Sequence, residues 1–467
     1  MADLKSLSRE ELLEIVASQQ RTIEEQQRLI AELRDEVEQL RRGGKRQAAP
    51  FSKGKRVENP KPPGRKPGQG PFTRRAAPVQ GPTETVIAQA PANCPDCGGA
   101  LEQEREEVAT VTDLPNQPQP AITVYRVPVC RCRRCGKRVR GTAPGLAEDQ
   151  VGATAHRVGA RVMAAAHALH YAIGIPVRKV PAVLHELTGI SLTQSAITQD
   201  AVQRAEGALG MACRELRDRV PEAPAVHTDD TGWRVGGQSA FLMGFDTDEA
   251  TVYQIRSQHR NQEVREIIPS NYGGVMVTDR GKSYDAEEFA GVAQQKCLAH
   301  ILRNIREVVD RKQGPARRFG EILMKLLRQG LALWYARGGG LNALQFQECA
   351  EKLSQELTRH LRNRILRDRD NQRLLDGIGF QHDRGHLLRF LKTEGVEPTN
   401  NRAERILRPA VIARKVSHCS RNQRGADAFA VFVSLAQTAR KKSEGTGRTV
   451  SQALLSFFAP VTPVASR

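Results

Sequence analysis

The sequence predicts a multidomain α+β protein, for three reasons. Its 467 residues allow roughly three domains of about 150 residues each. Apolar residues recur at helical spacing from 8 to 42 and again from about 150 to 220, whereas a series of strand-like runs begins near residue 223. Two Cys-x-x-Cys pairs lie between the two helical parts and indicate a small metal-binding module.

Composition narrows the class of protein further. Lys and Arg number 71 against 52 Asp and Glu, and the formal net charge of +19 favours a polyanionic partner such as nucleic acid. No run of 18 apolar residues is present, so no transmembrane helix is expected, and the first residues lack the apolar segment of a signal peptide. Nine cysteines are too few for a disulfide scaffold. A soluble intracellular protein is therefore expected.

Residues 1–42 are expected to form a coiled coil. Two sets of residues repeat every seven positions, as at the a and d positions of a heptad: Val16, Ile23, Ile30 and Val37, and Leu12, Gln19, Gln26, Leu33 and Leu40. β-Branched residues at a with Leu at d favour a parallel dimer. The alternative is one amphipathic helix that packs on its own chain, which the Pro-rich segment after it disfavours.

Residues 43–82 are predicted to be a disordered basic linker. Twelve basic residues and one acid lie between 41 and 75, together with six prolines, and this composition cannot bury a core. Arg65 and Lys66 have the side chains for an extended contact in a DNA minor groove. The simpler interpretation is a tether that touches phosphates without reading sequence.

Residues 83–148 are predicted to bind zinc. Cys94 and Cys97 form one Cys-x-x-Cys turn, Cys132 and Cys135 form another after 34 intervening residues, and four thiolates suit tetrahedral Zn²⁺. Four sulfur ligands leave no open position, so this zinc is expected to be structural. Cys130 is an alternative to Cys132, and residues 122–127 are expected to form the strand before the second turn. The other cysteines are expected to be buried thiols: Cys213, Cys297, Cys349 and Cys419.

Residues 149–222 are predicted to be a helical domain. Helices expected at 177–187 and 193–209, with a turn around Gly189 between them, resemble a helix-turn-helix that places its second helix in a DNA major groove. Such helix pairs also serve as plain scaffolding. Both interpretations stay open, because no base-contacting residue stands out.

Residues 223–300 are predicted to begin a catalytic core. Strands are expected at 225–235, 239–245, 250–255 and 274–278, with a helix at 261–268 before the last. This order matches the ribonuclease H-like arrangement, in which the first and fourth strands lie side by side. Asp229 on the first strand and Asp279 just after the fourth would then meet at one point.

Clustered carboxylates repel each other unless divalent cations bind between them. Two Mg²⁺ ions about 3.5–4 Å apart can activate an attacking oxygen and stabilise the leaving oxygen of a phosphodiester; Mn²⁺ is a possible substitute. The third acid is expected to be Glu404, in the second turn of a helix capped by Thr399. Seven basic residues lie between 402 and 424. The alternative is a surface Glu paired with Arg at helical spacing.

The chain resembles the IS66-type transposases, which are DDE enzymes of bacterial insertion sequences. The motifs that carry the resemblance are Asp-Asp-Thr at 229–231, Thr-Asp-Arg-Gly at 278–281, Cys-Leu-Ala-His at 297–300, and the blocks 398–405 and 414–438. The resemblance implies that Asp229, Asp279 and Glu404 are the metal-binding acids. The family's first motif is Asp-Glu-Thr, so Asp230 departs from it and competes weakly with Asp229.

The resemblance also implies a function. The expected protein binds insertion-sequence ends, cuts them in a Mg²⁺-dependent reaction and transfers the 3′-hydroxyls to target DNA, in the bacterial cytoplasm at the nucleoid. The coiled coil would join protomers, and small accessory proteins encoded nearby are suggested partners. The rival hypothesis is a non-catalytic, zinc-containing DNA-binding protein derived from a transposase. The expected phosphate contacts are Arg405, Arg408, Arg414 and Lys415.

The remaining predicted segments lie before and after Glu404 in the sequence. The 125 positions from Asp279 to Glu404 exceed what a compact core needs, so 301–395 are expected to be an α-helical insertion with helices at 319–333 and 350–369. Residues 396–445 would complete the core and 446–467 would form a tail. Trp334 is expected in the core of the insertion. Two ligands do not make a zinc site, so Cys297 and His300 are expected to pack or to support the acids.

Overall fold

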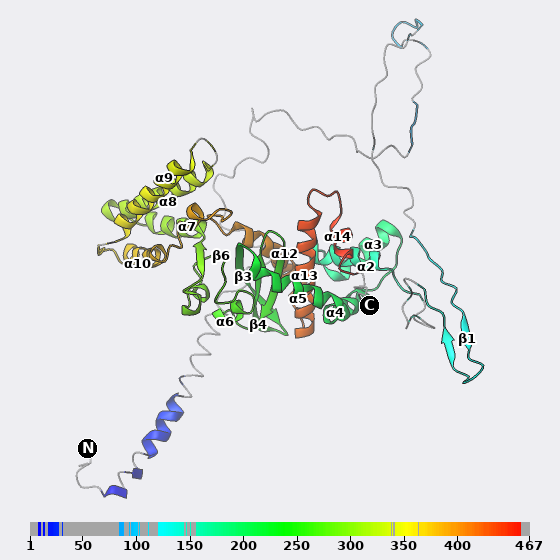
Figure 1. The fold of residues 1–467 in the computed structure, drawn as a ribbon, viewed down its shortest axis with the longest axis horizontal. Helices are drawn as coiled ribbons and strands as arrows, with labels where there is room; N and C mark the ends of the chain where they lie inside the picture. The colour runs from blue at the N-terminus through cyan, green and yellow to red at the C-terminus, as the bar shows by residue number, and fades with distance from the viewer. Residues whose placement is uncertain are drawn as a thin grey trace. The chain divides into compact units, whose positions relative to one another are not determined.

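Figure 1 shows the fold in a computed structural model of the chain. The residues that the structure describes are 8–10, 13–14, 17–27, 30, 84–87, 93, 95–100, 102, 111, 120–143, 146, 150, 156–337, 339, 341–362 and 364–458. The chain divides into two compact units, residues 1–113 and 114–467. The predicted basic linker, with Arg65 and Lys66, and the predicted zinc ligand Cys94 lie outside the described residues. No helix within the described ranges is long and apolar enough to cross a bilayer.

The described residues from 9 to 30 are helical. Ile23 and Ile30, which are one heptad apart, are 52% and 50% exposed.

A small hairpin carries the second Cys-x-x-Cys turn. Strand β1 (Val129–Arg131) pairs antiparallel with β2 (Arg138–Arg140). The strand expected at 122–127 was placed too early, because those residues form no regular structure and the ladder begins at Val129. The turn between β1 and β2 closes where the Cys132 N–H donates to the Lys137 carbonyl over 2.8 Å.

The centre of the second unit is a five-stranded mixed sheet. Its strands are β3 (Ala225–Val235), β4 (Gln238–Asp246), β5 (Thr251–Arg256), β6 (Val275–Thr278) and β7 (Ala293–Lys296). Their order is β5-β4-β3-β6-β7, and β6 lies parallel to both β3 and β7, whereas β4 is antiparallel to its neighbours. The hairpin β3–β4 turns at Gly236 and Gly237, whose φ values of 57° and 83° suit a two-residue turn. The fifth strand, β7, was not predicted.

Helices bury both faces of this sheet. Met276 of β6 belongs to a core shared with α5 (Ala208–Arg219), α12 (Asn401–Ser417), α13 (Gln423–Ser443) and α14 (Val450–Leu455). Its neighbours Val275 and Val277 belong to a second core. This alternation follows from the two-residue period of a strand. The free edge of β5 is covered, because Ser434 and Thr438 of α13 accept the N–H groups of Tyr253 and Thr251 over 2.8 and 3.1 Å.

The predicted helical region before the sheet contains α2 (Ala160–His167), α3 (Val180–Thr188) and α4 (Gln194–Glu206). Gly189 ends α3 with a φ of 70°, and the Thr193 side chain caps α4 by accepting the Ala196 N–H. The side chains of His167 and Asp200 lie 2.8 Å apart and join α2 to α4. Val180 and Leu184 of α3 form a separate small core with Ala166 and Ile197.

The second core is helical and lies on the β6–β7 side of the sheet (Figure 1). It is built by α7 (Leu298–Val309), α8 (Gly314–Tyr335), α9 (Ala343–Leu361), α10 (Arg369–Asp383) and α11 (Arg389–Lys392). The helix expected at 350–369 ends earlier, because Arg362 is extended and Asp368 caps the next helix. Trp334 packs at the edge of this core. Cys349 is exposed, so its assignment as a buried thiol was wrong.

Candidate active site

Asp229 and Asp279 come from neighbouring parallel strands. The register pairs His227 of β3 with Val277 of β6, so each Asp lies two residues beyond that pair. Asp279 follows β6 directly, and its Oδ1 accepts the Gly281 N–H over 2.8 Å. A Cβ at Gly281 would lie 2.9 Å from this same oxygen, so the tight turn favours glycine. The parallel pairing of β3 and β6 thus brings two carboxylates together, Asp229 from within β3 and Asp279 from just after β6.

The environment of Asp229 disfavours its negative charge. Burial, followed by the carboxylates of Asp279 and Asp230, raises the pKa of Asp229 to about 7. The N–H of Asp230, which donates to Asp229 Oδ1 over 2.9 Å, and the nearby His300 oppose this rise. An acid that is part-buried beside two like charges is typical of a catalytic or cation-binding site.

Glu404 lies at the start of α12 and contacts His300 of α7. His300 Nε2 is 3.5 Å from Glu404 Oε1. The N-cap of α12 is Asn400 rather than Thr399, and the Glu404 N–H donates to the Asn400 carbonyl, which places Glu404 in the first turn. The predicted cap was wrong by one residue because buried contacts, rather than a side-chain cap, hold Asn400 in place.

Three hydrogen bonds join the elements that carry the acids. The Cys297 N–H donates to the Thr278 carbonyl over 2.8 Å, immediately before Asp279. The Asn400 N–H donates to Cys297 Sγ over 3.1 Å, and Asn400 Nδ2 donates to the Thr228 carbonyl over 2.8 Å, immediately before Asp229. We call this series the Cys297–Asn400 link. It ties β6, α7, α12 and β3 together one residue away from two of the acids.

Cys297, which belongs to this link, interacts electrostatically with His300. Burial opposes ionisation of the Cys297 thiol, but His300 and the Asn400 N–H lower its pKa. The same contact with Cys297, aided by Glu404, raises the pKa of His300. His300 interacts with both Asp229 and Glu404, and the expectation that Cys297 and His300 pack or support the acids stays a prediction.

A family model described as "Transposase IS66 family" matches residues 156–428, more than half of the chain. The chain belongs to the IS66 transposase family. A second model, "zinc-finger binding domain of transposase IS66", matches residues 91–136, which hold both Cys-x-x-Cys pairs. The chain is also 24% identical over 412 residues to "Uncharacterized protein y4hP" of Sinorhizobium fredii (strain NBRC 101917 / NGR234), covering 79% of this chain and 72% of that relative.

The donor set of this IS66-family site fits a divalent cation. Mg²⁺ binds through one or two carboxylates plus waters or substrate oxygens, and Asp229 and Asp279 supply two carboxylates whose repulsion a cation would relieve. Glu404 is joined to this pair through His300 instead of lying directly against it. In the described part of the chain, no three His, Cys, Asp or Glu side chains are gathered closely enough to hold a metal by themselves.

Asp230, where the chain departs from the family motif, has a partner of its own. Its Oδ1 lies 3.0 Å from His259 Nδ1, and the His259 ring lies edge-on to Tyr284. Asp229 has no such side-chain partner within hydrogen-bonding distance among the described residues. This difference favours Asp229 over Asp230 as the acid available to a ligand.

The predicted basic contacts on α12 separate into two kinds. Arg405, Arg408 and Lys415 are exposed. Arg414 instead bonds β3, because its Nη1 donates to Thr231 Oγ1 over 2.9 Å and to the Gly232 carbonyl. Of the four predicted phosphate contacts, Arg414 is therefore the least available to DNA.

The sequence did not single out Asn400 or the fully buried Lys296. Asn400 lies within a quoted motif, but its amide gives no periodic signal. Lys296 Nζ lies 3.0 Å from Asp285 Oδ1 and donates to Thr278 Oγ1 over 3.1 Å, behind the acid site. Burial lowers the pKa of Lys296, and Asp285 opposes this. A lysine at the end of a short polar segment is ordinarily expected to be exposed, so the sequence does not indicate that Lys296 is buried.

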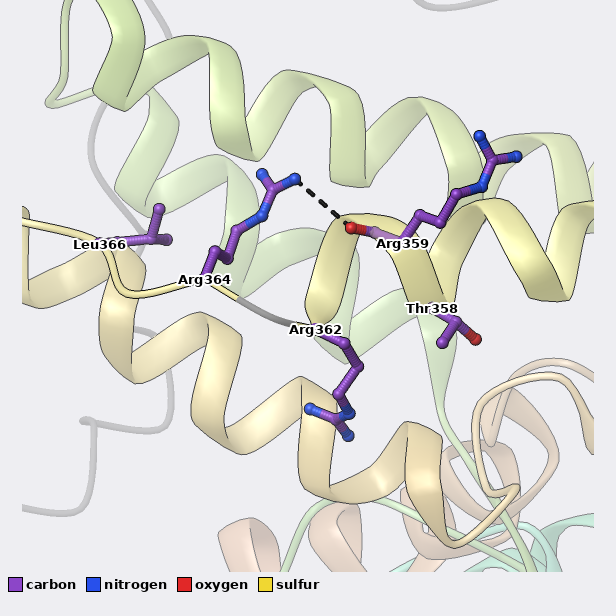
Figure 2. Close-up of a pocket in the computed structure, with 5 residues that line it drawn as sticks. All are labelled: Thr358, Arg359, Arg362, Arg364 and Leu366. Atoms are coloured by element: carbon purple, nitrogen blue, oxygen red, sulfur yellow. Dashed lines mark hydrogen bonds between the residues drawn. The ribbon is translucent and has the colours of Figure 1, made fainter.

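A separate cavity of about 540 Å³ at the end of α9 carries no acid. Figure 2 shows its lining residues: Thr358, Arg359, Arg362, Arg364 and Leu366. The arginines do not converge, because Arg364 donates to the Arg359 carbonyl while Arg362 turns to Asp383 of α10. This cavity is therefore not the candidate active site.

Proposed function

We propose that this chain is a DNA transposase that cuts the ends of its insertion sequence and transfers them to target DNA, with Asp229, Asp279 and Glu404 as its catalytic acids. Membership of the IS66 family supports a transposase-related function. The convergence of Asp229, within β3, and Asp279, just after the parallel strand β6, carries the catalytic assignment. His300 connects Glu404 to that pair.

The core is proposed to be ribonuclease H-like. Three antiparallel strands followed by two parallel ones, in the order β5-β4-β3-β6-β7, support this assignment. The helix after the last strand carries His300, and a later helix carries Glu404. The insertion helices α8 to α10 lie between these two helices in sequence, so the acids converge although long segments separate them.

Each group at the site has a distinct proposed role. Divalent cations held by Asp229, Asp279 and Glu404 would polarise the attacking and leaving oxygens of the phosphodiester. His300, whose pKa is raised, favours its protonated form and offsets the charge of Glu404. Arg405, Arg408 and Lys415 point away from the core and bind DNA phosphates. The Cys297–Asn400 link holds the acid-bearing elements in register.

The N-terminal parts are proposed to hold and pair the DNA ends. Cys94, Cys97, Cys132 and Cys135 would bind one structural zinc; the N–H groups of Cys135 and Arg134 lower the pKa of the Cys132 thiol, as a thiolate ligand requires. Arg65 and Lys66 would contact DNA. The coiled coil would join two protomers, so that two ends are cut in one assembly.

End cleavage by the purified full-length protein tests this proposal. The substrate is DNA that carries the inverted repeats flanking the gene, with Mg²⁺, and binding is measured in parallel by gel shift. Wild type is expected to nick the ends, whereas Asp279→Asn binds them and does not nick. Glu287→Gln, which neutralises an exposed carboxylate nearby in sequence, is the matched control and should cut normally. Binding without nicking by wild type would instead support a non-catalytic DNA-binding protein.

A further inference from the structure

A cavity of about 400 Å³ opens beside the candidate active site. It lies between the core and α10 of the helical insertion, and its volume is in the range of small-ligand sites. Asp279 and His300 form part of its wall, so the cavity is continuous with the acid site. Its lining residues are Asp279, Arg280, Asp285, His300, Asn304, Gly377, Phe380 and Gln381.

Two polar groups in this cavity lack partners. The part-buried guanidinium of Arg280 and the part-buried amide of Asn304 form no hydrogen bond or ion pair with any described residue. The polar side-chain atoms of both residues are not among the fully buried unpartnered atoms of the described residues, so they are accessible to a ligand in the cavity. A ligand with a phosphate and a polar edge would satisfy both.

An aromatic side chain completes the cavity. Phe380 is 44% exposed, although it lies on a helix whose other large apolar side chains are mostly buried. The Arg384 guanidinium carbon lies 4.4 Å from the centre of the Phe380 ring. Exposed aromatic rings and stacked guanidinium groups are surfaces on which unpaired bases stack.

The wall that carries Phe380 is fastened to the core. Gln381 Nε2 donates to Asp285 Oδ2 over 2.9 Å, and Asp285 pairs with the buried Lys296. The Lys296 N–H in turn donates to the His386 carbonyl just after α10. Phe380 is therefore held at a defined position relative to β7 and to the turn that carries Asp279.

We propose that this cavity receives one unpaired DNA base next to the strand position that is cut. The base would stack on the Phe380 ring, which Arg384 supports from its other face, Asn304 would hydrogen-bond its edge, and Arg280 would bind its phosphate. This inference rests on the proposed function, because the cavity opens onto Asp279. Asp279 and Asp285 in the wall disfavour a free nucleotide with several phosphates, whereas a base adds no charge.

Photocrosslinking to the full-length protein tests this assignment. End DNA carries 5-iododeoxyuridine at single positions around the cleavage point, and irradiated complexes are digested with trypsin for mass spectrometry. A crosslink is expected in the peptide 374–384, which contains Phe380. Phe380→Ala should lose it and Phe380→Tyr should keep it. Tyr335→Ala removes an aromatic side chain that is 77% exposed on α8 and does not line the cavity, so it should not change the crosslink.

Binding affinity provides the second measurement. A mismatch at the crosslinked position removes the cost of unpairing the base, so wild type should bind mismatched DNA more tightly than paired DNA. Phe380→Ala should bind the mismatched DNA about tenfold more weakly than wild type, as loss of one stacked base implies. An abasic residue at that position should remove this difference between the two proteins.

The outcomes of these experiments distinguish failure of the base-binding proposal from failure of the proposed function. If wild type cuts the ends but no crosslink falls in 374–384 and the mismatch effect is the same in Phe380→Ala, the base site is wrong and the transposase assignment stands. If the crosslink and the mismatch effect appear but wild type never cuts, the cavity assignment stands and the catalytic function fails.

Discussion

At the scale of single residues, Asp229 stands out because the fold disfavours its charge. Its pKa is raised to about 7 by burial and by the neighbouring carboxylates, from an ordinary value of 3.8. The folded protein therefore holds this proton up to a higher pH than the unfolded chain does. Stability is then highest below about pH 4 for this group and is lost as the pH rises towards 7.

Asp229→Asn is expected to stabilise the metal-free protein at pH 8. The gain should be on the order of 2 kcal/mol, less than the roughly 4 kcal/mol that about three pKa units imply in full, because the side chain is only part-buried. It should shrink as the pH falls from 7 towards 4. Thermal unfolding in EDTA across this range measures it. Equal stability of the two proteins at pH 8, or a larger gain at pH 5, would contradict the account.

Asn400→Ala is expected to slow DNA cleavage without weakening DNA binding. Removing the amide leaves the buried Thr228 carbonyl without its partner, which costs about 1–3 kcal/mol and loosens the Cys297–Asn400 link. Cleavage rate, DNA affinity and urea unfolding are the measurements. A lower rate with unchanged affinity indicates a positioning role.

Asn422→Ala is the matched control for Asn400→Ala. Asn422 caps α13 by accepting the Gly425 N–H, so its loss costs about 1 kcal/mol of stability away from the acids. If this variant slows cleavage as much as Asn400→Ala does, the effect of Asn400 is general destabilisation and the positioning role is wrong.

At the scale of elements, the β1–β2 hairpin distinguishes the two alternatives for the zinc ligand. Cys130 pairs with Val139 inside the ladder, whereas Cys132 lies in the turn with Cys135. The full-length protein is expected to contain one zinc per chain by metal analysis. Cys132→Ser and Cys135→Ser should lose it, and Cys130→Ser should retain it. Zinc loss in Cys130→Ser alone would reverse the ligand assignment.

Helix α12 gives a matched pair of arginines. Arg408 is exposed, so Arg408→Ala is expected to weaken DNA binding and to lower the slope of log affinity against log salt by about one. Arg414→Ala should leave that slope unchanged and lower the free energy of unfolding, because its guanidinium bonds β3. Binding titrations at several salt concentrations, with unfolding curves, check both. The reverse pattern would contradict the division of roles.

The elements also show what could be predicted from the sequence. Strands β3, β4, β5 and β6 carry apolar runs bounded by turn residues, so their places were predictable within a few residues. Strand β7 has the sequence Ala-Gln-Gln-Lys and was missed. Its polar side chains are buried and form hydrogen bonds. The Gln294 amide donates to the Tyr284 carbonyl, and the Gln295 amide donates to the Leu387 carbonyl. The first contact spans 10 positions and the second 92, so neither leaves a local sequence pattern.

At the scale of the whole molecule, the candidate site joins segments from distant parts of the chain. The proximity of Asp229 to Asp279 could be predicted, because the parallel pairing of the first and fourth strands brings these two positions together. The link of Asn400 to Thr228 and Cys297 could not, because it depends on how α12, which follows the insertion in sequence, packs against β3 and the start of α7. The insertion also supplies Phe380 beside the acids, so it contributes to the site as well as to the second core.

The most direct test of the central claim is a change in metal requirement at Asp279. A thiolate is a softer ligand than a carboxylate and supports Mn²⁺ better than Mg²⁺. Asp279→Cys should therefore bind the DNA ends, fail to cut them with Mg²⁺ and regain cutting with Mn²⁺, whereas wild type cuts with both. Equal cutting by Asp279→Cys and wild type in Mg²⁺, or binding without any cutting by wild type in either ion, would contradict the assignment of Asp279 as a metal-binding catalytic acid.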